Sequence, residues 1–103
     1  MAGQIKFDES THTKFKVKEP KMYHVIMYND DFTPMDFVVE ILMSVFGKSE
    51  SEAFRLMYAI HRGVKAVVGT YVYDIAVTKA DEAVKRAREE GYPFRVETEP
   101  VEQ

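Results

Sequence analysis

The run Met22–Tyr28 is apolar or aromatic at every position except His24, and it lies between Pro20 and the polar triplet Asn29–Asp31. A short apolar run between turn-forming residues is typical of a buried β-strand. A buried strand needs neighbouring strands and a covering layer, because a lone strand or hairpin is barely stable in water. The sequence therefore predicts a buried strand over residues 22–28 that leads into a polar turn.

A helix pattern follows this strand. Thr33, Pro34 and Asp36 predict a helix start in which Thr33 is the N-cap, Pro34 the first helical residue and Asp36 the acid of a capping box. Apolar residues between 38 and 46 then recur every three or four positions, which places them on one helical face. Gly47 is expected to end the helix.

A second helix pattern begins almost at once. Ser49 and Glu52 repeat the capping-box signal, an apolar stripe follows, and Gly63 marks the end. With only about two residues between the helices, we expect a tight antiparallel hairpin.

The last third of the chain alternates between strand and helix patterns. Residues 64–72 are rich in β-branched side chains, with Gly69 expected to mark a bulge or a close contact. A third helix, with alanines along its inner side and charged residues, Lys79 among them, on a solvated outer side, runs from about Asp74 to Gly91. Residues 94–98 alternate as a half-exposed strand. The order β-α-α-β-α-β predicts an α+β, two-layer sandwich of a three-stranded antiparallel sheet and three helices.

Length and charge limit the domain organisation. The 103 residues suit one domain, without cysteine for disulfides or thiolate sites. Residues 1–21 carry a net charge of +2 and residues 22–103 a net charge of −5, which sum to the chain's −3. We expect residues 1–21 to be a flexible N-terminal arm and residues 22–103 to be the domain. The acidic balance argues against a nucleic-acid-binding face.

The chain contains no apolar run long enough for a membrane span and no signal-peptide pattern at its start. These observations favour a cytoplasmic protein that does not bind membranes.

A polar corner is expected where the first strand enters the first helix. A tight helix hairpin brings His61, at the end of the second helix, towards Asn29 and Asp31. Amide, carboxylate and imidazole acceptors beside the apolar side chains of Met35 and Met57 resemble a receptor for a small cation, such as an ammonium group. The alternative for each residue is local: Asn and Asp favour turns, and His61 suits a helix C-terminus.

The same corner lacks the features of an active or metal site. No serine or cysteine stands in a recognisable nucleophile setting, so an Asp31–His61 pair has no third member. His24 and His61 lack metal-ligand spacing, and no phosphate-binding glycine motif occurs. We expect neither a catalytic residue, nor a metal, nor a cofactor.

Several strings of residues resemble the ClpS family, the adaptors of the ClpAP protease. They are Tyr23–Ile26, Asn29–Val38, Leu56–His61, the residues Gly63, Lys65, Ala66 and Gly69, and the pair Thr78-Lys79. The likeness covers roughly residues 22–98. It implies a non-enzymatic, monomeric adaptor that binds proteins beginning with Leu, Phe, Tyr or Trp, the N-degrons of the N-end rule. Such an adaptor hands them to the N-terminal domain of a ClpA-type or ClpC-type AAA+ unfoldase.

The resemblance also implies roles for individual residues. Asn29, Asp31 and His61 would accept hydrogen bonds from the α-ammonium group, with Asp30 adding negative potential. The residues that would line a pocket for the first side chain are Thr33, Met35, Val38, Met57, Ile60 and Phe94. Asp74 and Lys79 match positions that touch the unfoldase, and the arm would engage it during delivery.

Two other functions fit parts of the pattern. A factor-binding domain that resembles the C-terminal domain of the ribosomal stalk protein would share the α+β sandwich but would need no ammonium site. A hydrolase that uses Asp31 and His61 is the other alternative.

Overall fold

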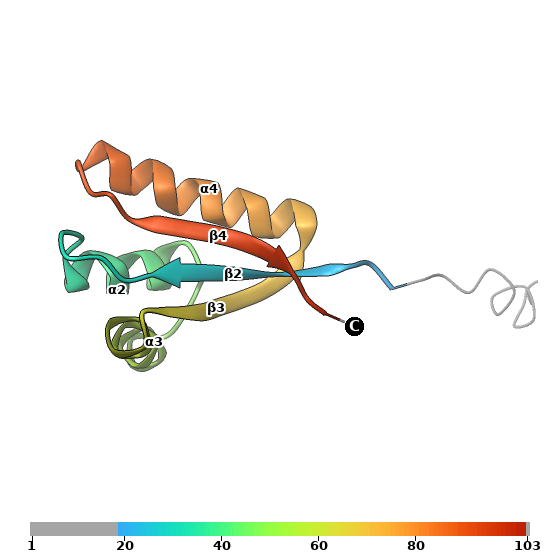
Figure 1. Cartoon of the computed structure of the whole chain (residues 1–103), viewed down its shortest axis with the longest axis horizontal. Coiled ribbons are helices and arrows are strands. Elements are labelled where there is room, and N and C mark those ends of the chain that lie inside the picture. Colours follow the sequence, from blue (N-terminus) through green and yellow to red (C-terminus); the bar gives the residue numbers. More distant parts are fainter. Residues whose placement is uncertain (1–18, 103) are drawn as a thin grey trace, which may run out of the picture.

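A three-stranded antiparallel sheet in the order β3-β2-β4, with three helices packed on it, forms the fold in the computed structural model (Figure 1). The structure describes residues 19–102, so all but the last three residues of the expected arm lie outside it. In chain order the elements are β2 (Met22–Tyr28), α2 (Met35–Ser44), α3 (Glu50–Gly63), β3 (Lys65–Val72), α4 (Tyr73–Glu89) and β4 (Arg95–Pro100). The predicted α+β class and element order are confirmed.

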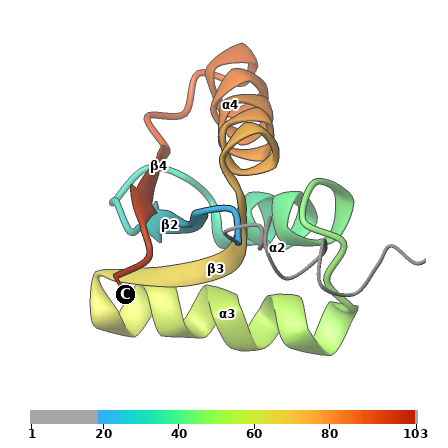
Figure 2. The ribbon, with the colours of Figure 1, turned by 90° about the vertical axis from the view of Figure 1, so that its right-hand side faces the viewer.

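Strand β2 is the central strand of the sheet. It pairs antiparallel with β3 and with β4, and Val25 and Met27 are completely buried beneath the helices. The other face of the sheet carries polar pairs, such as the 2.9 Å hydrogen bond between His24 Nδ1 and Thr70 Oγ1. Figure 2 shows the helices arranged around one side of the twisted sheet.

Helix α4 lies close along the sheet because its inner side consists of small residues. Ala76, Ala80, Ala83 and Ala87 are buried, and the helix contacts all three strands. The predicted alanine face is therefore confirmed, and Gly91, with φ +83°, ends this segment as expected.

The expected start of the first helix is wrong. Helix α2 begins at Met35 with Pro34 as its N-cap residue, and no side chain caps it. The Thr33 hydroxyl instead donates to Asp30 Oδ2 at 2.8 Å. Asp30 therefore competes for the group that was expected to cap the helix.

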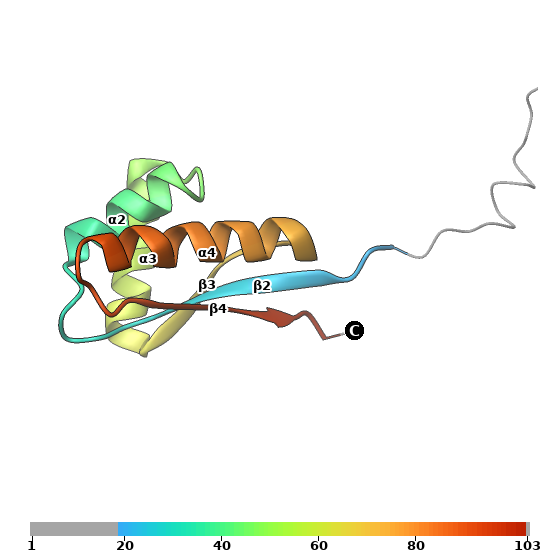
Figure 3. The same cartoon turned by 90° about the horizontal axis from the view of Figure 1, so that it is seen from above.

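The expected helix hairpin is also wrong. Five residues, 45–49, separate α2 from α3, and the two helices cross steeply: Figure 1 shows α3 nearly end-on where α2 runs lengthwise, and Figure 3 shows the same crossing from above. Gly47, with φ +67°, lies in this connection, and Ser49 caps α3 by accepting the Glu52 N–H at 3.2 Å, as predicted.

Gly69 marks both of the features that its position suggested. The pairing of β2 with β3 slips between Val25 and Ile26, opposite Val67–Gly69, which is a β-bulge. A Cβ atom at Gly69 would also lie 2.6 Å from a ring carbon of Tyr71. Glycine is needed here for space rather than for an unusual backbone angle.

Candidate functional site

The turn that leaves β2 is held by one carboxylate. Asp30 Oδ1 accepts the backbone N–H groups of Phe32 at 2.8 Å and of Thr33 at 2.7 Å, while Oδ2 accepts the Thr33 hydroxyl. This arrangement is the side-chain turn that aspartate favours. Asp30 therefore fixes the backbone that carries Asn29 and Asp31.

The ionised form of Asp30 is favoured in the folded chain. Partial burial alone would raise its pKa, but the hydrogen bonds from Thr33 and Phe32, with Arg88 nearby, together hold the pKa below its ordinary value of 3.8. A carboxyl whose pKa is lower in the folded state stabilises the fold above the unfolded-state pKa, and this contribution disappears as the pH falls through the folded-state pKa.

Asp30→Asn is expected to lower the free energy of unfolding by about 1 kcal/mol at neutral pH, because the charged acceptor of three hydrogen bonds is lost. The difference from the original chain should begin to shrink as the pH falls to 3.8, the ordinary pKa, and should vanish below the lower pKa that Asp30 has in the folded chain. Urea unfolding of both proteins between pH 2 and pH 7 measures it. If the difference were constant over this pH range, the ionised Asp30 carboxylate would not be what stabilises the turn.

The end of α3 lies beside this turn. Asn29 N–H donates to Val64 O at 2.7 Å, and Tyr28 pairs with Lys65 at the start of β3. His61 is in the last turn of α3, so sheet pairing rather than a helix hairpin brings its segment to the corner. The side chains of Asn29, Asp31 and His61 are exposed, and none of them makes a hydrogen bond to another residue of the described range 19–102. Their acceptors are thus available to a ligand.

Sequence reasoning missed a strained residue at this corner. Val64 has φ +75° and ψ −41°, a conformation that β-branched residues avoid. It accepts the Asn29 N–H in this conformation, so the strain is coupled to the turn. The glycine before it, Gly63, ends the helix as predicted but does not take the positive φ.

Val64→Gly is expected to raise the free energy of unfolding by roughly 0.5–1 kcal/mol. Removing a cost of about 1–2 kcal/mol for a left-handed L-residue outweighs the added backbone entropy of glycine, and the 66% exposed side chain contributes little burial. The matched control is Val67→Gly on β3, where φ is not positive and the same change should destabilise. Urea unfolding measures both variants. If Val64→Gly also destabilised the domain, the backbone at Val64 would not be strained.

The residues expected to line a side-chain pocket are mostly packed in the core. Val38, Met57, Ile60 and Phe94 are at most 7% exposed and belong to one buried cluster. Thr33 is half-buried and bonded to Asp30. Met35 is 43% exposed, and the neighbouring Phe32 is 77% exposed. Sequence reasoning gave Phe32 no role, although an aromatic residue directly after two turn carboxylates was the available signal.

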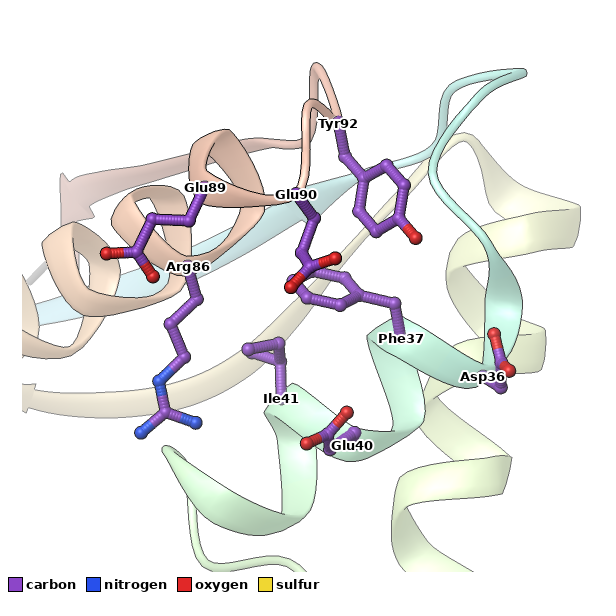
Figure 4. A pocket seen from close by; sticks show the side chains of 8 residues that line it. All are labelled: Asp36, Phe37, Glu40, Ile41, Arg86, Glu89, Glu90 and Tyr92. Carbon is purple, nitrogen blue, oxygen red and sulfur yellow. The ribbon is translucent and has the colours of Figure 1, made fainter.

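Two hollows in the described structure lie away from these six residues. One, of about 310 Å³, lies between α2 and the end of α4 and is lined by residues such as Phe37, Ile41 and Tyr92 (Figure 4). The other, of about 600 Å³, lies between Lys21 and residues 99–102. Neither hollow is therefore an open pocket beside the polar corner.

Asp74 and Lys79 differ in their surroundings. Asp74 is exposed in the first turn of α4. Lys79 is half-buried, and its Nζ donates to Val45 O at 2.9 Å and lies 5.5 Å from the centre of the Tyr71 ring. The expectation that Lys79 belongs to the solvated side of this helix is wrong, because its ammonium group satisfies a carbonyl left free at the end of α2.

Within residues 19–102, no three His, Cys, Asp or Glu side chains are grouped so that they could hold a metal ion. The helices of this same range include none with the length and apolarity needed to cross a membrane.

The fold and the corner define a class: a small α+β domain with an open three-stranded sheet and with exposed acceptor side chains where β2 and α3 end. The family model of the ATP-dependent Clp protease adaptor protein ClpS matches residues 18–97, and the chain belongs to this family. The family consists of adaptor proteins of the Clp protease and not of enzymes.

Individual relatives support the same assignment over most of the chain. The ATP-dependent Clp protease adapter protein ClpS of Clostridium acetobutylicum is 43% identical over 96 residues, which cover 93% of this chain and 95% of the relative. The adapter protein ClpS of Acetivibrio thermocellus is 50% identical over 88 residues, 85% of this chain and 89% of the relative. A solved structure of Agrobacterium tumefaciens ClpS2 bound to L-phenylalaninamide is 44% identical, with a TM-score of 0.79, and the match covers 81% of this chain and 100% of that one.

Proposed function

We propose that this adaptor binds polypeptides whose first residue is Leu, Phe, Tyr or Trp and delivers them to a AAA+ unfoldase of the Clp protease. The observation that carries the proposal is the hydrogen bond from Asn29 N–H to Val64 O, which brings the Asn29–Asp31 turn to the end of α3. The Agrobacterium relative was solved with L-phenylalaninamide, a molecule with a free α-amino group and an aromatic side chain. That ligand has the chemistry of a chain's first residue.

The three free acceptors suit an α-ammonium group. An α-amino group has a pKa of about 7.7–8.0, so it is mostly charged at neutral pH and donates three hydrogen bonds. Asn29, Asp31 and His61 would each accept one, while Asp30, already bonded within the turn, contributes negative potential. A charge-assisted hydrogen bond contributes about 1.5–3 kcal/mol.

The first side chain would enter beside Met35. Of the six residues assigned to the pocket, Met35 is the most exposed, and methionine changes shape more readily than other apolar residues. Once Met35 moves, the walls would be formed by the assigned residues that are buried in the core: Val38, Met57, Ile60 and Phe94. Thr33, bonded to Asp30, would form part of the rim.

Delivery would use other surfaces. Asp74, exposed in the first turn of α4, would contact the N-terminal domain of a ClpA-type or ClpC-type unfoldase, together with the half-buried Lys79. The N-terminal arm would engage the unfoldase during transfer. We place these events in the cytoplasm.

A titration with fluorescent peptides that differ only in their first residue tests the proposal. Peptides beginning with Phe or Leu should bind, while those beginning with Ile or Arg should bind far more weakly. His61→Ala should weaken the binding of the Phe peptide. A factor-binding domain without an ammonium site would be unaffected by this change, and equal binding by all four peptides would refute recognition of the first residue.

Met57→Ala is expected to admit peptides that begin with Ile or Val. We propose that the Met57 side chain crowds a branched Cβ, and truncation removes that contact. Because Met57 is 5% exposed, the same change should lower the free energy of unfolding by about 2–5 kcal/mol. Met43→Ala, at a 40% exposed position of α2, is the matched control and should change neither property. If a folded Met57→Ala variant still rejected peptides that begin with Ile or Val, Met57 would not be the residue that excludes them.

A further inference from the structure

A groove between α2 and the end of α4 lies outside the polar corner. It encloses about 310 Å³, with the rings of Phe37 and Tyr92 and the side chain of Ile41 as its apolar lining (Figure 4). Phe37 packs edge-to-face against Tyr92, with ring centres 5.0 Å apart, so this lining is well packed. The groove therefore has a packed apolar floor beneath a rim of charged side chains.

Charge is distributed unevenly along the groove. The carboxylates of Asp36 and Glu40 from α2, and of Glu89 and Glu90 from the end of α4, line it. The guanidinium of Arg86 lies at one end, on the same side as the Glu89 carboxylate (Figure 4), and donates to Glu82 at 2.8 Å and to Ser44 Oγ at 3.0 Å. Arg86 is the basic residue of this lining, and the end of the groove away from it carries the carboxylates of Glu90 and Asp36.

We propose that residues 5–9 of this chain, which lie outside the described structure, dock in this groove. Lys6 would lie among the carboxylates, its flanking residues Ile5 and Phe7 would contact the apolar lining, and Asp8 and Glu9 would face Arg86. A lysine whose apolar neighbours rest on aromatic rings combines apolar burial with charge pairing.

Reach excludes the lysines next to the domain but not Lys14, which is eight residues before Met22 and spans up to about 27 Å. Lys6 is favoured over Lys14 because two acidic residues follow it closely, whereas Lys14 is followed by another lysine. The start of β2 and the first turn of α4 lie together, since the Tyr23 and Tyr73 rings are 4.9 Å apart. Arg86 is 13 residues further along α4, roughly 20 Å away at 1.5 Å per residue. Lys16 and Lys18, six and four residues before Met22, span at most about 20 Å, whereas Lys6, 16 residues before it, spans up to about 55 Å.

The order of charges agrees with this direction. A segment that comes from Met22 meets Arg86 before Glu90, and along this path it presents Asp8 and Glu9 before Lys6. Opposite charges are therefore matched at both ends of the groove. Such exposed pairs contribute little individually, but tethering on the same chain gives an effective concentration on the order of millimolar, which populates a weak contact.

A spin label tests the docking in the full chain. The chain has no cysteine, so Gly3→Cys provides a single labelling site. In the ¹⁵N-labelled protein, the label should broaden the amide signals of residues 36–41 and 86–92 more than those of residues 60–67. Broadening that is spread evenly over the domain, or absent from the groove, would overturn the proposal.

Charge reversal identifies the contact. Glu90→Lys should remove most of the broadening, and so should Lys6→Glu, while the two changes together should restore it. Asp81→Lys, the same change at an exposed position of α4 outside the groove, is the matched control and should leave the broadening intact. Equal losses in Glu90→Lys and Asp81→Lys would show a general effect of net charge and would refute this groove as the docking site.

Discussion

A peptide that begins with phenylalanine is expected to lose at least roughly 100-fold in affinity when its α-amino group is acetylated. Acetylation removes the positive charge and two of the three donors, and the loss of two charge-assisted hydrogen bonds amounts to about 3 kcal/mol. The acceptors concerned are those of Asn29, Asp31 and His61, whose side chains are exposed at the corner. Fluorescence anisotropy with the free and the acetylated peptide measures the loss.

The acetylated peptide also separates the ammonium site from the side-chain pocket. In the His61→Ala variant, the difference between the free and acetylated peptides should become smaller, because one acceptor of the ammonium group is gone. A peptide that is shortened at its C-terminus serves as the control, since its first residue is unchanged. Equal affinity for the free and acetylated peptides would remove the ammonium group from the recognition mechanism.

Phe94→Ala is expected to lower the free energy of unfolding by about 3–5 kcal/mol, which is a large part of the stability of a small domain. Phe94 is 1% exposed, and its ring packs edge-to-face against Phe37 at 6.2 Å. The expected side-chain pocket would use this residue, but in the fold its ring fills the core. Urea or thermal unfolding measures the change.

Phe32→Ala removes the same atoms from a ring that is 77% exposed, and it provides the matched control. Its free energy of unfolding should stay within about 0.5 kcal/mol of the original chain. If Phe94→Ala destabilised the domain as little as Phe32→Ala, the ring of Phe94 would not be the core element that its burial indicates.

Much of the fold could be predicted from the sequence, because the relevant signals are local and strong. The strand Met22–Tyr28 has the predicted bounds, and the alanines of α4 lie on its buried side. The start of α2 could not be predicted in the same way. Thr33 and Asp30 are both suitable partners for free backbone or hydroxyl groups, and only the folded turn decides that Asp30 binds Thr33.

The corner could be predicted only in part. The end of α3 lies near the turn, as predicted, but for a different reason. The pairing of Tyr28 with Lys65 brings the two segments together, whereas α2 and α3 cross steeply and form no hairpin. The strain at Val64 has no sequence signal, because glycine stands one residue earlier. The hydrophobic pattern of the sequence also does not distinguish a side chain of the core from one that lines a pocket. Met57 and Phe94 therefore fit the pattern equally well in either role.

Titration of the ¹⁵N- and ¹³C-labelled protein with L-phenylalaninamide, followed by NMR, tests recognition of the α-ammonium group most directly. The side-chain resonances of Asn29, Asp31 and His61 should shift together and saturate with one dissociation constant, while N-acetyl-phenylalaninamide should leave them unmoved. Shifts confined to another surface, or the same shifts with both compounds, would contradict it.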